Sequence, residues 1–395
     1  MSSMIPYKTI GDICLVLNGF AFKSQNYVDS GYRVIRISNV QKGRVIDDAP
    51  KYYPLDLMRN LGQYILKEND LLMSLTGNVG RVGLLTKNLL PAALNQRVAC
   101  LRLKDDSVLL KYLFYYLNSD RFEEEAIHSA SGIAQKNMST EWLKGVSLPV
   151  PSIEVQRDIV AELDVISQLI EKKQQQLNDL DSLSHSLYYE TFGNPLNNSK
   201  NWSILSIGEL SQDVKYGTSL PGGSEGQYKY LRMNNLTSDG YFDLTDIKYI
   251  DLSGAELEKC LVHKGDILFN RTNSLDLVGK TALFDFEEDM VIAGYLIRVR
   301  VNNSIINPNY LVRHMNLPSS KAILKTMAKG AVNQANINSK ELQSIKVPVP
   351  PIELQYEFDE KIRRINAQKE LIKLSQQEIS NLFYSRIEFY FNSND

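Results

Sequence analysis

Two long stretches of the chain, within 152–190 and within 351–395, place apolar side chains alternately four and three residues apart. This spacing lines the side chains up along one side of an α-helix, and about four heptads of it are typical of a coiled-coil seam. We therefore expect two long helices that pack against each other. The expected packing residues are Ile159, Leu163, Ile166, Ile170, Leu177, Leu180 and Leu187 in the first helix, and Phe358, Ile362, Ile365, Ile372, Ile379 and Phe383 in the second.

Polar residues interrupt both seams, at Lys173 and Ser184 in the first and at Lys369, Gln376 and Arg386 in the second. A polar side chain at a seam position fixes the register of two helices at some cost in stability. The alternative is that each helix packs only on its own domain. The length of both stripes and their acidic or amide-rich outer faces favour pairing of the helices.

Shorter patterns outside these stretches predict two mixed domains, 1–151 and 191–350. Alternating or apolar runs bounded by Gly, Asn and Asp indicate strands. Each region is therefore expected to form an α+β domain of about 150 residues. The expected strands include Val34–Ile37, Asp70–Leu75, Ala99–Leu103 and Leu296–Val301, and the expected helices include Val108–Asn118 and Asn309–Asn316.

The sequence also repeats itself, because Leu148–Gln156 returns as Val347–Gln355, 199 residues later. This period is too long for a solenoid repeat, which runs to roughly 20–50 residues. We expect two tandem homologous domains, each followed by a long helix that begins after Pro151 or Pro351. Further matching pairs are 32–40 with 228–236, 70–73 with 266–269, 112–118 with 310–316, and 135–138 with 334–337.

The net charge of −2 over 395 residues argues, by itself, against a nucleic-acid partner. The charge is unevenly distributed, with net values of +4 in 1–151, −5 in 152–190, +1 in 191–350 and −2 in 351–395. The domains are mildly basic and the helices are acidic. A phosphate-binding surface on the domains would therefore be hidden in the total.

Composition favours a cytoplasmic protein without a membrane segment. No run approaches the ~18 apolar residues that a membrane span needs, and the first residues lack the layout of a signal peptide. Cys14, Cys100 and Cys260 are far apart and odd in number. They fit small buried side chains in a reducing compartment better than a disulfide framework or a metal pair.

Catalytic motifs are missing from the sequence. Ser274–Thr281 ends like a phosphate-binding loop but begins with Ser, where the backbone cradle requires Gly. The four histidines have no metal-ligand spacing, so no metal site is expected. No nucleophile elbow or paired-carboxylate motif is evident. The sequence therefore points to a non-catalytic recognition or scaffold protein.

The predicted helix length fits a spacer. About 30 helical residues span ~45 Å, and one turn of B-DNA repeats every ~34–36 Å. Two modules held this far apart could face the same side of a duplex, with the helices as a ruler between them.

Several motifs together resemble one known family over essentially the whole chain. They are the Pro-Val-Pro-Ser/Pro-Ile-Glu-x-Gln motif before each helix, the Gln-x-Asn-Met/Ile segment upstream of it, Asn18–Ser24, and Thr76–Gly80. With these marks, two of them present twice and in order, the chain resembles the specificity subunit of type I restriction–modification enzymes.

The resemblance implies two target recognition domains whose helices pair as an antiparallel coiled-coil spacer. Each domain would read one half of a bipartite, asymmetric double-stranded DNA target. Two methyltransferase subunits would dock on the helices, and motor-nuclease subunits would complete the complex. The methyltransferase would carry S-adenosylmethionine for adenine N6 methylation, and this chain would hold neither cofactor nor catalytic group. Because Arg271–Ser274 replaces Leu75–Asn78, and Gly217–Pro221 lacks the Phe-Lys-Ser element, the two halves should read different sequences.

Base reading needs side chains with paired donors and acceptors, chiefly Arg or Lys for guanine and Asn or Gln for adenine. Scattered Arg and Lys are expected to contact phosphates. An Asn before a helix can instead be a cap, which is the alternative for Asn137 and Asn336. The candidate base readers are Lys23, Ser24, Thr76, Asn78, Arg81, Gln135, Lys136 and Asn137 in the first domain, and Arg271, Thr272, Asn273, Lys280, Gln334, Asn336 and Asn338 in the second. The candidate phosphate contacts are Arg36, Arg97, Arg232 and Lys329.

Two other functions are alternatives to DNA recognition. One is a non-DNA scaffold whose duplicated domains bind two copies of a protein partner. A stand-alone nuclease or methyltransferase is disfavoured by the missing motifs.

Overall fold

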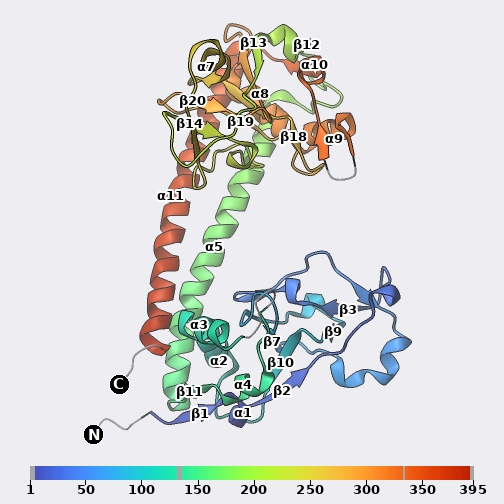
Figure 1. The fold of residues 1–395 in the computed structure, drawn as a ribbon, viewed down its shortest axis with the longest axis vertical. Helices are drawn as coiled ribbons and strands as arrows, with labels where there is room; N and C mark the ends of the chain where they lie inside the picture. Colours follow the sequence, from blue (N-terminus) through green and yellow to red (C-terminus); the bar gives the residue numbers. More distant parts are fainter. Residues whose placement is uncertain (1–4, 131–135, 332–333, 392–395) are drawn as a thin grey trace. The chain divides into compact units, whose positions relative to one another are not determined.

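The computed structural model describes residues 5–130, 136–331 and 334–391, which form two compact units (Figure 1). Unit 1 comprises Met1–Gln175 and Lys373–Asp395, and unit 2 comprises Gln176–Ile372. Each unit joins one α+β domain to the start of one long helix and the end of the other. The expected domain boundaries at 151, 190 and 350 stay predictions.

Unit 1 is built on a four-stranded antiparallel sheet with the order β2-β10-β7-β8, beside the smaller sheets β6-β3-β9 and β1-β11. Side chains alternate between the faces of a strand, so Leu71 and Met73 pack under the helices while Leu72 packs on the opposite side. The elements are β1 (Tyr7–Thr9), α1 (Ile10–Ile13), β2 (Cys14–Asn18), β3 (Tyr32–Ile35), β4 (Val40–Gln41), β5 (Arg44–Val45), β6 (Tyr52–Tyr53), β7 (Leu71–Ser74), β8 (Val82–Leu84), β9 (Ala92–Leu94), β10 (Val98–Leu103), α2 (Leu110–Leu117), α3 (Asp120–Ser129), α4 (Thr140–Gly145) and β11 (Ser147–Pro149).

Unit 2 repeats this design with the sheet β13-β21-β17-β19 and the smaller sheets β15-β14-β20-β16, β12-β24 and β18-β23-β22. The parallel pair β3-β9 of unit 1 returns as the parallel pair β14-β20. The elements are β12 (Ser203–Ser206), α6 (Ile207–Leu210), β13 (Ser211–Tyr216), β14 (Tyr228–Leu231), β15 (Lys248–Ile250), α7 (Gly254–Cys260), β16 (Leu261–Val262), β17 (Ile267–Asn270), β18 (Thr272–Asn273), β19 (Thr281–Leu283), β20 (Met290–Ile292), β21 (Leu296–Val301), α8 (Pro308–Asn316), α9 (Pro318–Met327), β22 (Lys329–Ala331), β23 (Gln334–Asn336), α10 (Ser339–Ser344) and β24 (Lys346–Val349).

The same ion pair holds the central sheet in both units. In unit 1 the Arg102 guanidinium donates to both carboxylate oxygens of Asp70, at 2.7 Å each. In unit 2 Arg300 donates to Asp266 in the same way, at 2.8 and 3.1 Å. Both carboxylates are buried, and a two-point arginine contact is the arrangement that best satisfies a buried carboxylate. The repeat predicted from the sequence is therefore confirmed in the architecture.

The glutamine that ends the repeated motif explains why the motif recurs. Gln156 is fully buried, and its Oε1 accepts from the Leu109 backbone N–H at 2.8 Å while its Nε2 donates to two backbone carbonyls. Gln355 accepts from the Asn307 N–H at 2.8 Å and donates to Pro350 and Ile305 carbonyls. In each unit this side chain fastens the start of the long helix to the segment before α2 or α8.

The long helices α5 (Ile153–Phe192) and α11 (Ile352–Phe391) have 40 residues each and exceed the length of about 30 that we expected. Within unit 1, Glu162 of α5 binds Arg386, and the Ile170 carbonyl accepts from Gln376. Going forward along α5 therefore means going backward along α11, so the helices run antiparallel (Figure 1).

The helix seams are buried to different degrees along their length. Within the described part of the chain, none of the expected packing residues is exposed. The first three of each seam are buried and the later ones are half-buried; the buried ones are Ile159, Leu163, Ile166, Phe358, Ile362 and Ile365. Ile159 and Leu163 also belong to the core of their own domain. Pairing of the helices and packing on the domain therefore occur together rather than as alternatives. Coiled-coil geometry as such stays a prediction.

One strand ends earlier than its sequence pattern indicates. The run Val34–Ile37 was expected to be extended throughout, but β3 stops at Ile35 and Ile37–Asn39 form a 3-10 turn. The Asn39 side chain causes the turn, because its Oδ1 accepts from the Arg36 backbone N–H at 3.0 Å. The other strands and helices expected from the sequence are present within one or two residues of the predicted ends.

In the part of the chain that the structure describes, no helix is both long enough and apolar enough to cross a membrane. No group of three His, Cys, Asp or Glu residues is arranged there to hold a metal ion. The three cysteines are unpaired and buried, and burial raises the thiol pKa of Cys14 to about 12 and that of Cys260 to about 11.

Candidate nucleic-acid interface

In unit 1, the loop after β7 lies against the segment before α4. Thr76 and Asn137 form a β-bridge, and the Gly77 N–H donates to the Lys136 carbonyl at 3.0 Å. Four candidate residues that are distant in sequence (Thr76, Asn78, Lys136 and Asn137) therefore share one edge of the domain. Asn78, Lys136 and Asn137 are exposed, as a surface that contacts DNA requires.

Arginines surround this edge. Asn78, with its side-chain oxygen toward Arg81, accepts from both terminal guanidinium nitrogens at 3.2 Å, and Arg81 also donates to Gln41. Exposed Arg97 is adjacent, because its carbonyl accepts from the Leu75 N–H at 2.9 Å. The loop can follow this path because Gly80 has φ +79°, and a Cβ there would lie 2.8 Å from the Ala126 side chain.

The remaining candidates of unit 1 are not joined to this edge by the contacts of the structure. Lys23 and Ser24 are exposed and belong to a separate 3-10 turn, Ser24–Asn26, which Lys23 precedes and Ser24 begins. Arg36 donates to the Ala49 carbonyl at 2.6 Å, which holds its guanidinium against its own domain. Gln135 lies outside the described residues.

In unit 2, the corresponding edge is more regular. Strands β18 and β23 pair there, and the Thr272 hydroxyl donates to the Asn336 side chain at 2.9 Å. Asn273 donates to Asn270 at 3.0 Å. Arg271 precedes them, and its carbonyl accepts from the Ile337 N–H. Thr272 and Asn336 therefore hold each other in place and Asn270 holds Asn273, so only part of their hydrogen-bonding capacity remains for a ligand.

Two candidate base readers of unit 2, Lys280 and Asn338, instead make contacts that stabilise their own domain. Lys280 is buried and donates to the Leu236 and Met233 carbonyls at 2.8 and 3.3 Å, and burial lowers its pKa. Asn338 caps α10, where its Oδ1 accepts from the Glu341 N–H at 3.0 Å. The caps of α4 and α10 are Ser139 and Asn338, so Asn137 and Asn336 are not caps. For Lys329 and Gln334 the side chains lie outside the described residues.

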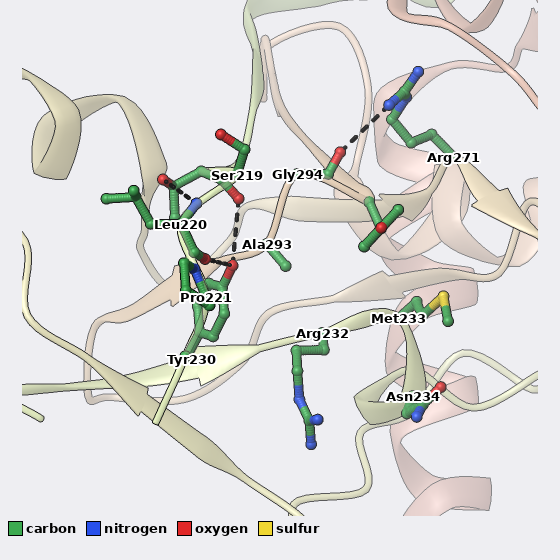
Figure 2. Close-up of a pocket in the computed structure, with 13 residues that line it drawn as sticks. Ser219, Leu220, Pro221, Tyr230, Arg232, Met233, Asn234, Arg271, Ala293 and Gly294 are labelled. Atoms are coloured by element: carbon green, nitrogen blue, oxygen red, sulfur yellow. Dashed lines mark hydrogen bonds between the residues drawn. The ribbon is translucent and has the colours of Figure 1, made fainter. Parts of the chain in front are cut away.

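Unit 2 also contains a cavity of about 470 Å³ next to this edge (Figure 2). The Tyr230 hydroxyl closes one side by donating to the Leu220 carbonyl at 2.9 Å. Arg271 reaches the opposite side, where it makes a long 3.5 Å contact with the Gly294 carbonyl. Most of the lining is apolar or aromatic and comes from Leu220, Pro221, Tyr230, Met233, Ala293 and Tyr295.

The two arginines of this cavity differ electrostatically. Arg232 is neutralised by Asp246, with its Nη2 2.8 Å from the carboxylate. Arg271 forms no ion pair with any described residue, and its guanidinium lies 5.0 Å from the centre of the Tyr216 ring. In both arginines the buried Nε has no hydrogen-bond partner among the described residues. An unneutralised guanidinium at the edge of an apolar cavity is a site for an acceptor-rich ligand.

Sequence reasoning missed the cavity residues Asn234 and Tyr295, and Tyr216, whose ring lies under the Arg271 guanidinium. The only signal was the departure of Gly217–Pro221 from the first copy, which marks where the cavity wall differs. The other walls come from Tyr230–Asn234, from Arg271 and from Ala293–Tyr295. These segments are separated along the chain, and no local pattern connects them.

The fold and this surface define a class of protein: a duplicated recognition protein whose two similar units carry different loops at the same edge. The sequence profile of the type I restriction modification DNA specificity domain matches residues 5–181 and 199–382. The chain belongs to this family, and the resemblance seen in its motifs is confirmed.

Relatives and solved structures agree with this assignment. The chain is 20% identical to the type I restriction enzyme EcoKI specificity subunit of Escherichia coli K12, over 92% of this chain and 82% of that protein. It is 27% identical to the MjaVIII specificity subunit of Methanocaldococcus jannaschii. The matches to two M. jannaschii proteins span less than half of those relatives, 46% and 40%.

The fold resembles the S subunit of a type I restriction–modification system from M. genitalium, with a TM-score of 0.53 and 17% identity over 100% of this chain and 98% of that one. A second structure, described as concerning complex assembly and conformational transition of the type I system, gives a TM-score of 0.54 over 98% of both chains, also at 17% identity.

Proposed function

We propose that this chain is the DNA-specificity subunit of a type I restriction–modification complex, and that each unit reads one half of a bipartite, asymmetric target. The observation that carries the proposal is the pairing of an identical framework with different edge chemistry. Unit 1 offers Thr76, Asn78 and Lys136 at the edge where unit 2 offers Arg271 and Asn273. Two copies with one geometry and two sets of donors and acceptors suit two half-sites of different sequence.

In unit 1 the proposed DNA contacts are the exposed Asn78, Lys136, Asn137 and Arg97, because they share one edge and belong to the residue types that read bases and bind phosphates. Arg81 stays in the proposal as the partner of Asn78. In unit 2 the proposed contacts centre on Arg271 and Asn273. Lys280 and Asn338 are given the structural roles described above.

The long helices are proposed as the spacer between half-sites and as the docking surface for two methyltransferase subunits. At 1.5 Å per residue a 40-residue helix is ~60 Å long. In unit 1, Leu374, Leu382 and Phe389 are exposed on α11, eight and seven residues apart. That spacing of about two turns places them on one side of the helix, away from the seam, and exposed apolar stripes of this kind are typical of protein interfaces.

S-adenosylmethionine belongs, in this proposal, to the methyltransferase subunits, and this chain contributes no catalytic group. Motor-nuclease subunits would join the same complex for cleavage. A cytoplasmic location is part of the proposal and is supported by the three buried, unpaired cysteines.

The test is to map N6-methyladenine across a genome in cells that carry the methyltransferase with and without this chain. We expect methylation at two short motifs separated by a fixed gap, present only when the chain is expressed. Exchanging unit 2 for that of a relative should replace one motif and keep the other. A complex that forms but directs methylation to no motif would contradict the proposal and favour a protein-binding scaffold.

A further inference from the structure

The cavity of unit 2 has a counterpart position in unit 1 that is filled. In unit 1, Phe20 bridges to Asn95 and packs on Phe22 and Tyr64 at ring separations of 5.2 and 5.3 Å. In unit 2 the matching bridge joins Thr218 to Ala293. Thr218 occupies the backbone position of Phe20 and has a much smaller side chain. The space that the phenyl ring would fill is therefore left open in unit 2.

The two units also carry their arginine on different members of one pair of hydrogen-bonded residues. The Leu75 N–H donates to the Arg97 carbonyl at 2.9 Å, and the Arg271 N–H donates to the Tyr295 carbonyl at 3.0 Å. These are equivalent backbone pairs, so Leu75 corresponds to Arg271 and Arg97 to Tyr295. Each unit therefore presents one guanidinium here, but from opposite partners of the pair.

The residues around Arg271 position its guanidinium and leave donors available for a ligand. The Tyr216 ring lies beneath its guanidinium at 5.0 Å, and the position that corresponds to Tyr216 in unit 1 is Asn18, which has no ring. The side chain is partly exposed, carries no ion pair with a described residue, and has a buried Nε without a partner among them. A fixed guanidinium with free donors loses little conformational freedom when it binds.

We infer that Arg271 is the specificity-determining residue of unit 2, that it reads a guanine through O6 and N7 at the mouth of this cavity, and that Tyr216 is its positioning residue. The inference rests on the proposed DNA-reading function. Guanine is the base whose major-groove edge presents two acceptors to a forked donor. The largely apolar lining of the cavity lowers the local dielectric and strengthens hydrogen bonds made at its mouth.

The experiment uses the purified complex of the full chain with its methyltransferase partner. A pool of random duplexes is selected by binding and sequenced, and the selected duplex is then titrated at several salt concentrations. The wild-type complex should enrich two half-sites, with a guanine in the one that unit 2 reads. Arg271→Leu, which installs the residue of unit 1, should lose that guanine preference alone and bind the selected duplex about tenfold to hundredfold more weakly.

Two further variants test the geometry. Arg271→Lys keeps the charge but not the forked donor pair, so it should lose the guanine preference almost as fully as Arg271→Leu. Tyr216→Phe keeps the ring and should retain the preference, whereas Tyr216→Leu should weaken it without changing any other position of the motif.

Three outcomes would contradict these proposals in distinguishable ways. If Arg271→Leu weakens binding to all duplexes equally with a shallower salt dependence, or Arg271→Lys binds as the wild type does, then Arg271 contacts a phosphate and the inference is wrong. If Arg271→Leu retains both half-sites unchanged, the inference is again wrong while the proposed function stands. If the wild-type complex enriches no motif, the proposed function fails and the inference fails with it.

Discussion

Units 1 and 2 share the arrangement of the central sheet, its ion pair and the contacts of the motif glutamine, but differ in the chemistry buried around them. Where β10 of unit 1 buries Cys100, β21 of unit 2 buries Arg298, which is 2% exposed and donates to Asp213 at 2.6 Å. Where α2 carries Tyr116, α8 carries His314. The contacts that set the geometry of the framework are therefore present in both units. The polar residues that unit 2 buries in place of unit 1's side chains have hydrogen-bond partners within unit 2.

The difference is clearest at the end of the long helices. In unit 1 the apolar Ile387 lies four residues before Phe391, whereas in unit 2 the residue four positions before the matching Phe192 is Tyr188. The Tyr188 hydroxyl lies 2.8 Å from His314 Nδ1, and its ring stacks on Tyr310. Unit 2 thus has a buried Tyr–His pair where unit 1 has Ile387 and Tyr116, whose hydroxyl donates to the Ser147 carbonyl at 3.0 Å. The two units should respond alike to loss of a shared contact and differently to loss of an individual one.

The largest and most symmetrical effect is expected for the shared glutamines. Gln156→Leu and Gln355→Leu each remove three hydrogen bonds of a fully buried amide and leave a backbone N–H and two carbonyls unsatisfied. Each should lower the free energy of unfolding of its own unit by about 4 kcal/mol. Hydrogen exchange resolved by segment would measure both units in one experiment.

The matched control is Gln168→Leu, an exposed position on α5, which should change stability by less than about 0.5 kcal/mol. A large effect of one glutamine and a small effect of the other would show that the common framework is less symmetrical than its contacts indicate.

The second prediction concerns the buried arginine that only unit 2 has. Arg298→Leu removes the arginine donor of Asp213 and of the Leu261 carbonyl and leaves Asp213 with Lys215, whose Nζ is 3.6 Å away. It should therefore destabilise unit 2 by about 3 kcal/mol, the low end for a broken buried pair because Asp213 is 29% exposed. Adding Asp213→Leu should recover most of that loss, since it removes the stranded carboxylate.

Equilibrium unfolding of the two variants and of Asp213→Leu alone gives the coupling between the residues. Cys100→Ala in unit 1 is the control at the matching strand position. Additive losses in the double variant would show that Arg298 acts through packing and not through its ion pair.

How much of this could be read from the sequence depends on how local the cause is. The seams and the strands were predictable because each follows from spacing within a short segment, and the repeat because its two copies have similar sequences. The early end of β3 was missed although its cause is local, because the Asn39 side chain ends a strand that the apolar pattern continues. The burial of Lys280 was not predictable, because its acceptors are Met233 and Leu236, more than 40 residues away. The cavity beside Arg271 depends on four separate segments, which only the fold brings together.

The third prediction uses the buried histidine of unit 2. Burial lowers the pKa of His314 to about 4 from an ordinary value near 6.5. The unfolded chain therefore binds a proton below pH 6.5 that the folded chain does not bind until about pH 4. Stability from this group is complete above pH 6.5 and declines as the pH falls through this window, by about 2 kcal/mol at pH 5.

Denaturant unfolding between pH 7.5 and pH 4.5 would measure this slope in unit 2. His314→Tyr, which installs the residue of unit 1, removes the titrating group and should flatten that part of the profile. An unchanged slope in this variant would assign the acid sensitivity to other groups.

The smallest change in the free energy of unfolding is expected at the polar seam position of unit 2. Lys369 is buried on α11 and pairs with Asp181 of α5, whereas the matching position of unit 1 is the half-buried Ile170. Lys369→Ile removes the cost of burying an ammonium group and leaves a carboxylate that is 54% exposed and can be hydrated. The free energy of unfolding should therefore change by less than about 1 kcal/mol, in either direction. A polar seam residue specifies register more than it adds stability. Lys369→Ile should therefore lose helix order around 366–372, seen as faster hydrogen exchange there, whereas the control Leu371→Ala at an exposed position should not. A loss of several kcal/mol with unaltered local exchange would show that Lys369 serves stability instead.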